Sequence, residues 1–129
     1  MNRSLIVLLA FLALPNVLNS SHLYNQKQLI VTSESSIESI KFAKYLKDKG
    51  VIKYSAYWCP NCLNQSELFG KQAYKELQVV ECAKDGLNSQ TQLCIDKQIK
   101  GFPTWEINGK LILGVLSLKE LSRLTEYKN

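Results

Sequence analysis

Two of the four cysteines in this 129-residue chain form the motif Cys59-Pro60-Asn61-Cys62, the part of the sequence best suited to chemistry. The motif follows a β-rich segment, residues 51–57, and opens a segment with the apolar spacing of a helix. Cys59 is thereby expected at the helix N-cap, where unpaired backbone N–H groups and the helix dipole favour a thiolate. Cys62 follows one turn later, close enough to attack a mixed disulfide formed at Cys59. The spacing therefore predicts a redox-active dithiol with Cys59 as nucleophile and Cys62 as resolving thiol.

Other uses of a Cys-x-x-Cys pair have different requirements. Haem attachment needs a histidine directly after the second cysteine, and Leu63 stands there, so that use is excluded. A zinc site would need a second closely spaced pair, whereas Cys82 and Cys94 are far apart in the chain. A purely structural disulfide is the remaining alternative, and Pro60 and the strand-to-helix setting weigh against it. We expect neither a metal nor a cofactor.

Length and composition bound the class of protein. A chain of 129 residues that is 46% hydrophobic and 21% charged suits one folded domain and argues against disorder. The formal net charge of +5 comes from lysines spread along the chain, with no dense basic block that carries aromatic residues. Nucleic-acid binding is therefore not expected, and we predict a monomer.

Residues 1–20 are expected to lie outside the fold. Arg3 precedes an apolar run, residues 5–14, which is too short to cross a bilayer as a helix. A positive start, a short apolar centre and a polar end are typical of a secretory signal, and an uncleaved N-terminal membrane anchor is the alternative. Either form predicts export to a compartment where disulfides persist, with the folded domain at residues 21–129.

Hydropathy patterns in the remainder predict alternating strands and helices. Strands are expected at 28–32, 51–57, 79–82, 104–107 and 110–113, and helices after 33–36, from 58 to about 77, at 89–97 and at 118–127. Ser35 and Glu38 have capping-box spacing for the first helix, which Gly50 ends. Asn108-Gly109 is a strong two-residue hairpin signal. The order β-α-β-α-β-α-β-β-α indicates an α/β domain with a partly parallel central sheet.

A second motif, Gly101-Phe102-Pro103-Thr104, lies at the start of a predicted strand. Proline at the first residue of a strand cannot donate to the ladder, so it belongs at an edge or in a turn. Together with Trp58-Cys59-Pro60-Asn61-Cys62, this motif resembles the thioredoxin-like fold, in which a central mixed sheet is flanked by helices. The resemblance implies a cis Phe102–Pro103 bond that faces the dithiol. It also implies a substrate groove, formed here by Trp58, Pro60, Phe102, Pro103 and Thr104.

Further motifs narrow the resemblance. They are residues 56–62, 67–71, 80–83, 85–86, 94 and 99–110. With them the chain resembles the thioredoxin-like domain that is fused to, or works with, vitamin K epoxide reductase (VKOR) homologues in cyanobacteria and plant chloroplasts. The resemblance implies oxidation of client-protein thiols in the thylakoid lumen or periplasm, and reoxidation by a membrane partner that passes electrons to quinone. Because this sequence contains no four-helix membrane segment, we expect that partner to be a separate polypeptide.

Two positions depart from common thioredoxin patterns. Many thioredoxins have a buried acid six positions before the first cysteine, where this chain has Lys53. The Lys53 ammonium would favour a thiolate if it lay near the dithiol, and would otherwise reach solvent. The Pro-Asn dipeptide between the cysteines replaces the Gly-Pro of typical reducing thioredoxins and resembles the dipeptides of periplasmic oxidants. A stabilised Cys59 thiolate stabilises the reduced form, which makes the couple more oxidising.

Cys82 and Cys94 are expected to form a second, structural disulfide, because residues 83–92 between them are polar and loop-like. Closing a loop of this size stabilises a fold by about 3 kcal/mol. An electron relay to Cys59 and Cys62 is the functional alternative for this pair. For the whole protein, the alternative to an oxidoreductase is a peptide-binding or chaperone-like module with two inert disulfides.

Overall fold

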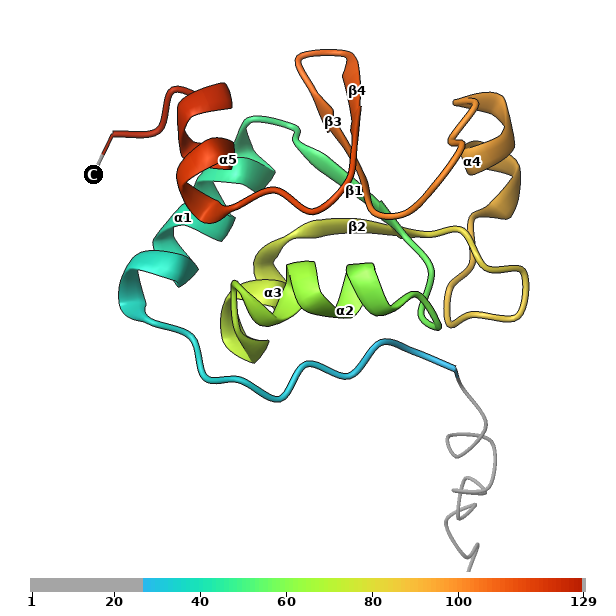
Figure 1. Cartoon of the computed structure of the whole chain (residues 1–129), viewed down its shortest axis with the longest axis horizontal. Helices are drawn as coiled ribbons and strands as arrows, with labels where there is room; N and C mark the ends of the chain where they lie inside the picture. The colour runs from blue at the N-terminus through green and yellow to red at the C-terminus, as the bar shows by residue number, and fades with distance from the viewer. Residues whose placement is uncertain (1–26, 129) are drawn as a thin grey trace, which may run out of the picture.

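The computed structural model describes residues 27–128, which fold as helices around one four-stranded mixed sheet (Figure 1). The helices are α1 (Ile37–Asp48), α2 (Pro60–Glu67), α3 (Lys71–Glu76), α4 (Thr91–Asp96) and α5 (Leu118–Leu124). The strands are β1 (Ile52–Ser55), β2 (Gln78–Glu81), β3 (Thr104–Ile107) and β4 (Lys110–Leu113). The predicted class, α/β with a thioredoxin-like fold, is confirmed. The expected signal or anchor at residues 1–20 lies outside the described residues.

The sheet has the order β2-β1-β3-β4, with β1 parallel to β2 and antiparallel to β3. Tyr54 of β1 stands opposite Val80 on one side and Thr104 on the other. Because β1 has a neighbour on both edges, its end is held firmly, and the Cys59–Cys62 motif follows it within a few residues. In Figure 1 the short helix α4 lies apart from the other four helices. None of the helices described here is long and apolar enough to cross a membrane.

The main hydrophobic core lies between the sheet and the helices α1, α3 and α5. Its buried members are Phe42, Ala43, Leu46, Val51, Phe69, Ala73, Leu77, Trp105, Ile107 and Leu121. A smaller cluster contains Tyr54 and Val80, whose side chains pack with Cys82 and Cys94 at the α4 end. Side chains alternate between the two faces along each strand, so the two clusters lie on opposite faces of the sheet.

A buried glutamine holds the motif-bearing helix α2 to the rest of the fold. Gln65 Oε1 accepts hydrogen bonds from Trp105 Nε1 at 3.1 Å and from Leu116 N at 2.7 Å. Gln65 Nε2 donates to Leu116 O at 2.9 Å. These bonds connect α2 to β3 and to the segment that leads into α5, so the position of the dithiol is fixed from two directions.

The strand predicted at residues 28–32 is wrong. The described chain forms one isolated bridge there, between Lys27 and Gly86. The backbone N–H groups of Thr32 and Ser33 donate instead to the Glu67 carboxylate, each at 2.8 Å. Since a side chain at the end of α2 takes these donors, the segment is tied down without joining the sheet.

The single helix predicted from residue 58 to about 77 is two helices. The chain turns between them at Gly70, whose φ is +83° and whose added Cβ would lie 2.5 Å from Ser35 Oγ. Ser35, expected to cap α1, instead accepts a hydrogen bond from Ala73 N in α3 at 2.9 Å. The N-cap of α1 is Ser36, which accepts from Ser39 N at 3.0 Å. A contact between segments distant in sequence thus replaces the predicted local cap.

Candidate active site

The Cys59–Cys62 motif sits where the chain passes from β1 into α2. Cys59 is the N-cap of α2, with extended backbone angles (φ −83°, ψ 118°), and Pro60 takes the first helical position. Proline fits there because the first N–H groups of a helix have no partner within the helix. Both cysteines are free thiols. This is the placement that the spacing predicted.

The two sulfur-bearing residues differ in exposure. Cys59 is 8% exposed, whereas Cys62 is fully buried. The Cys59 thiol donates to Phe102 O at 3.5 Å, and the Phe102–Pro103 peptide bond is cis, as the resemblance implied. An attacking group can therefore reach Cys59 before Cys62.

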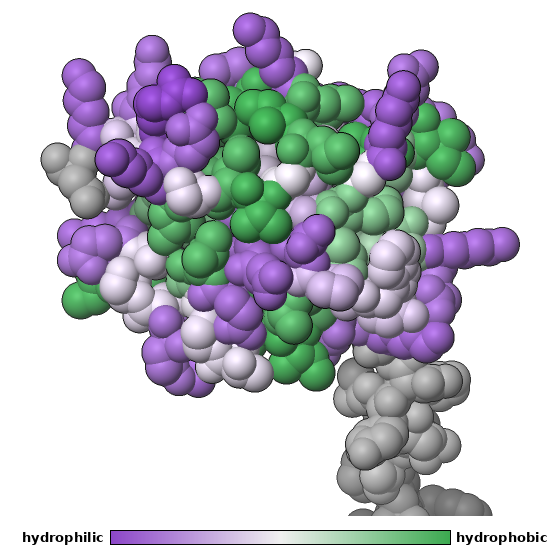
Figure 2. All heavy atoms as spheres, in the orientation of Figure 1, coloured by the Kyte–Doolittle hydropathy of each residue, from purple (hydrophilic) through white to green (hydrophobic). Residues whose placement is uncertain are grey.

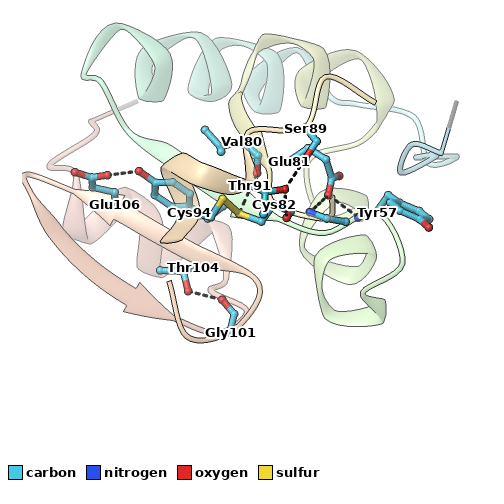
Figure 3. Close-up of a disulfide and its surroundings, with 12 residues drawn as sticks. Tyr57, Val80, Glu81, Cys82, Ser89, Thr91, Cys94, Gly101, Thr104 and Glu106 are labelled. Carbon is cyan, nitrogen blue, oxygen red and sulfur yellow. Dashed lines mark hydrogen bonds between the residues drawn. A yellow bond between two sulfur atoms is a disulfide. The ribbon is translucent and has the colours of Figure 1, made fainter. Parts of the chain in front are cut away.

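The residues expected to form the substrate groove differ in how exposed they are and in what they contact. Trp58 is 59% exposed and stands edge-on to Phe102, with ring centroids 6.1 Å apart. Pro60 is exposed, and Pro103 is fully buried. Thr104 is buried, and its hydroxyl donates to Gly101 O at 2.7 Å (Figure 3). Trp58 and Phe102 are thus the aromatic groups that border the thiol, while the Thr104 hydroxyl is already occupied.

Cys62 is surrounded by groups with opposing effects on its ionisation. Burial, the largest effect, raises the pKa of the Cys62 thiol. The Ser55 hydroxyl, the Ala56 N–H and the Lys53 charge act in the other direction, because each favours the thiolate. Burial therefore favours the neutral Cys62 thiol, and the groups around it are placed to favour its anion.

Lys53 lies below the dithiol and is fully buried, so the alternative that its ammonium reaches solvent is wrong. The Lys53 Nζ donates to Cys62 O at 3.2 Å and to Ser66 Oγ at 2.6 Å. Burial lowers the pKa of Lys53 to about 8, while nearby anions, Cys62 first among them, oppose the change. Sequence reasoning identified the position but left its burial open; a lysine within the apolar strand segment 51–57 is the signal that favours it.

Glu81, at the end of β2, is a residue that sequence reasoning missed. Its carboxylate accepts hydrogen bonds from Ala83 N at 2.8 Å and Tyr57 N at 3.3 Å (Figure 3). Burial raises the pKa of Glu81, and the backbone donors and Lys53 oppose that rise. An acid within the apolar run 79–82 was the available signal. The bonds join the loop before Cys59 to the end of β2.

Cys82 and Cys94 form a disulfide, the pairing expected from the sequence (Figure 3). Their Cα atoms are 5.8 Å apart, and both residues are buried beside Tyr54 and Val80. Thr91 Oγ1 donates to Cys82 O at 3.0 Å. The bond therefore connects the end of β2 to α4, within a cluster separate from the one that contains Cys59 and Cys62.

Metal ligands are not grouped in the part of the chain that the structure describes. Among residues 27–128, no three side chains of histidine, cysteine, aspartate or glutamate are arranged to hold a metal ion. The groups of this site that can take part in chemistry include its two thiols and the side chains that contact them.

Comparison with known proteins identifies a relative with a known activity. No family model matches the chain. Over 100 residues, the chain is 44% identical to the thiol-disulfide oxidoreductase LTO1 of Arabidopsis thaliana. The match covers 75% of this chain and 27% of the relative, so the chain corresponds to about a quarter of that protein's length. The chain is thus homologous to part of a thiol-disulfide oxidoreductase.

Proposed function

We propose that this protein is a thiol–disulfide oxidoreductase that exchanges disulfides with client-protein cysteines through Cys59 and Cys62. The observation that carries the proposal is the placement of the free dithiol: Cys59 occupies the N-cap position of α2 and keeps 8% of its surface exposed, and Cys62 lies one turn inside and fully buried. The 44% identity to part of an oxidoreductase supports the same chemistry.

In the oxidising direction the Cys59–Cys62 disulfide accepts two electrons. A client thiolate attacks Cys59 Sγ, the bond between the two protein sulfurs breaks, and its electron pair leaves on Cys62 as a thiolate. A second client thiolate then attacks the client sulfur bound to Cys59 and displaces Cys59 as a thiolate. The client gains one disulfide, and protons released from its thiols balance those taken up by Cys59 and Cys62.

The same groups perform reduction or isomerisation in reverse. Cys59 attacks a client disulfide and releases one client thiolate, and Cys62 loses its proton and attacks Cys59 Sγ to release the other. The balance between directions depends on the reduction potential of the pair, where about 30 mV corresponds to a tenfold change in the equilibrium constant.

Clients are proposed to bind along the groove of Trp58, Pro60, Phe102, Pro103 and Thr104. The exposed Trp58 ring beside Cys59 offers a flat apolar contact to an extended chain. Leu113 lies against Gly101, the residue before Phe102, since a Cβ added at Gly101 would be 2.9 Å from Leu113 Cδ1. The Leu113 side chain is 62% exposed, so it extends the apolar surface next to Phe102. Figure 2 shows hydrophobic side chains gathered among polar ones on one face of the molecule. The exposed side chains of Trp58 and Leu113 suit unfolded clients whose apolar residues are still accessible.

The proposed setting is the thylakoid lumen or the periplasm, with a VKOR-like, quinone-linked membrane protein as oxidant. Support comes from the apolar run at residues 5–14 and from the family resemblance. Fractionation of cells that express the full chain tests export. Purified VKOR-like protein in quinone-containing vesicles tests the partner: reoxidation of the reduced chain supports the proposal, and reoxidation no faster than with empty vesicles refutes it.

Insulin reduction with dithiothreitol tests the activity. The wild-type chain is expected to accelerate precipitation of the insulin B chain, and Cys59→Ser to abolish the acceleration. A Cys82→Ala/Cys94→Ala variant is the matched control, because it removes two sulfurs from the other cluster. A wild-type rate equal to background would favour a non-catalytic peptide-binding module.

A further inference from the structure

Lys53 is an unusual residue to find under a dithiol. It is the one charged side chain among residues 27–128 that is buried, with no exposed surface. Within the same residues no carboxylate lies within ion-pair distance of its Nζ. A buried charge without a partner is costly, so its retention calls for a functional explanation.

The surroundings of the ammonium satisfy its hydrogen bonds, but no carboxylate among the described residues is in ion-pair contact with it. Two N–H groups donate to Cys62 O and Ser66 Oγ. The Nζ also lies over the Tyr74 ring, 5.4 Å from the centroid. All three partners are neutral. The charge is therefore held in place by groups that do not neutralise it.

Three groups near Lys53 can carry negative charge. They are the thiol of Cys62 in α2, the thiol of Cys59 at the N-cap of that helix, and the Glu81 carboxylate in β2. Tyr74, from α3, stays neutral because burial raises its pKa to about 12. Glu81 is bound by two backbone N–H groups, which leaves the thiols as the anions that form and disappear beside Lys53 during exchange.

The Ser55 hydroxyl is a second potential hydrogen-bond donor near Cys62. Ser55 Oγ is buried and has no hydrogen-bond partner among the described residues. A buried hydroxyl without a partner loses free energy, and a thiolate is a stronger acceptor than a thiol. Ser55 already belongs to the set of groups that favour Cys62 ionisation. Its hydroxyl is therefore available to an anion on Cys62.

We propose that Lys53 and Ser55 form a thiolate-receiving site beneath Cys62, in which the Lys53 ammonium is the counter-charge and the Ser55 hydroxyl a donor. The inference rests on the proposed function and assigns these residues a positioning role in it. When a client thiolate attacks Cys59, the electron pair of the broken bond arrives on Cys62 beside a fixed positive charge. In reverse, the same charge favours loss of the Cys62 proton, which passes to solvent.

The sign of the buried charge has a direct consequence for redox direction. A carboxylate at this position would repel the departing thiolate, whereas an ammonium attracts it. The disulfide form contains no anion for Lys53 to attract. Lys53 therefore stabilises the reduced form relative to the disulfide form, and the couple becomes more oxidising.

The test uses the full chain with Lys53→Met, which removes the charge and keeps an unbranched side chain. Lys53→Gln removes the charge and retains a donor, and Lys44→Met removes an exposed charge as the matched control. In a Cys59→Ser background Cys62 is the one free thiol, so ultraviolet absorbance of its thiolate is followed against pH. The redox equilibrium of the Cys59–Cys62 pair is measured in glutathione buffers without the Cys59→Ser change.

Both neutral variants are expected to raise the pH at which the Cys62 thiolate forms by about one unit, which is a tenfold change in the ionisation equilibrium. Ser55→Ala is expected to raise this pH by a smaller amount. The equilibrium with glutathione should shift about tenfold toward the disulfide form, or about 30 mV more negative. A purely structural role would change the unfolding midpoint without moving either quantity. If both neutral variants match Lys44→Met while the wild type exchanges with glutathione, the inference is wrong and the proposed function stands. If the wild type does not exchange, the proposed function fails.

Discussion

Replacing Lys53 with methionine is expected to stabilise the oxidised protein at neutral pH. The substitution removes a buried charge and leaves few unsatisfied groups behind. Cys62 O still accepts a hydrogen bond from Ser66 Oγ, at 2.8 Å, so neither of the partners of Lys53 loses its last bond. Methionine is unbranched and adaptable, and it fills the space of the lysine stem without strain.

The size of the effect follows from the ionisation of Lys53. Burial lowers the pKa of Lys53 from 10.5 to about 8, a difference that corresponds to about 3 kcal/mol in favour of the neutral form. In the oxidised protein Cys59 and Cys62 cannot ionise, so the attraction that opposes this shift is weaker. Lys53→Met should therefore raise the free energy of unfolding by about 3 kcal/mol at pH 7.

The gain is expected to depend on pH. Between about pH 8 and 10.5 the folded wild type has released the Lys53 proton, while the unfolded chain still binds it. Wild-type stability therefore rises through this window, because the unfolded state holds more protons. The variant lacks this titration, so its advantage should shrink as the pH rises.

Urea unfolding of both oxidised proteins, followed by circular dichroism at several pH values, measures the effect. Lys44→Met is the control, since it removes an exposed charge from α1. A Lys53→Met variant that is less stable than wild type at pH 7, or a gain that stays constant up to pH 10.5, would refute the reasoning.

Two further predictions concern the framework of the site. Cys82→Ala/Cys94→Ala is expected to lower the free energy of unfolding by about 3 kcal/mol through lost loop closure, with insulin reduction retained. Loss of activity in a folded variant would favour the electron relay. Gln65→Met should cost about 3 kcal/mol, because three buried hydrogen bonds are lost at about 1 kcal/mol each, whereas exposed Gln92→Met should cost little. Equal urea midpoints for the two glutamine variants would contradict the assigned network.

Local sequence signals predicted the parts of the fold that depend on local geometry. The hairpin between β3 and β4 turns at Asn108 and Gly109, with φ values of +51° and +75°, which suits the residue types that tolerate left-handed backbone. Cys59 and Pro60 occupy the N-cap and first position of α2 for an equally local reason. Such features need no knowledge of distant contacts.

Errors arose where residues far apart in the chain compete for the same backbone groups. Residues 28–32 have the pattern of a strand, but Glu67 takes the donors of Thr32 and Ser33. The apolar pattern after Cys62 continues past Gly70, yet close approach of Ser35 breaks the helix there. Periodicity reports which residues are apolar and carries no information about these pairings.

In the candidate site, too, some features could be predicted from the sequence and others depend on contacts between distant residues. The dithiol was evident from spacing and the aromatic border from a family resemblance. The roles of Ser55 and Glu81 could not be predicted from the sequence. A serine or a glutamate within a strand has no distinguishing pattern, and its role depends on which groups lie next to it in the fold. The sequence shows only that Lys53 stands where many thioredoxins have a buried acid. Its effect on the dithiol depends on its burial, which results from packing in three dimensions.

Trapping the exchange intermediate tests the central claim most directly. Reduced Cys62→Ser protein, which retains Cys59 and lacks the resolving thiol, is mixed with a disulfide-containing client and analysed by mass spectrometry of its peptides. The proposed chemistry predicts a stable mixed disulfide between the client and Cys59, and none with Cys59→Ser protein. Absence of the Cys59 adduct, or an equally abundant adduct on Cys62 of the Cys59→Ser protein, would contradict it.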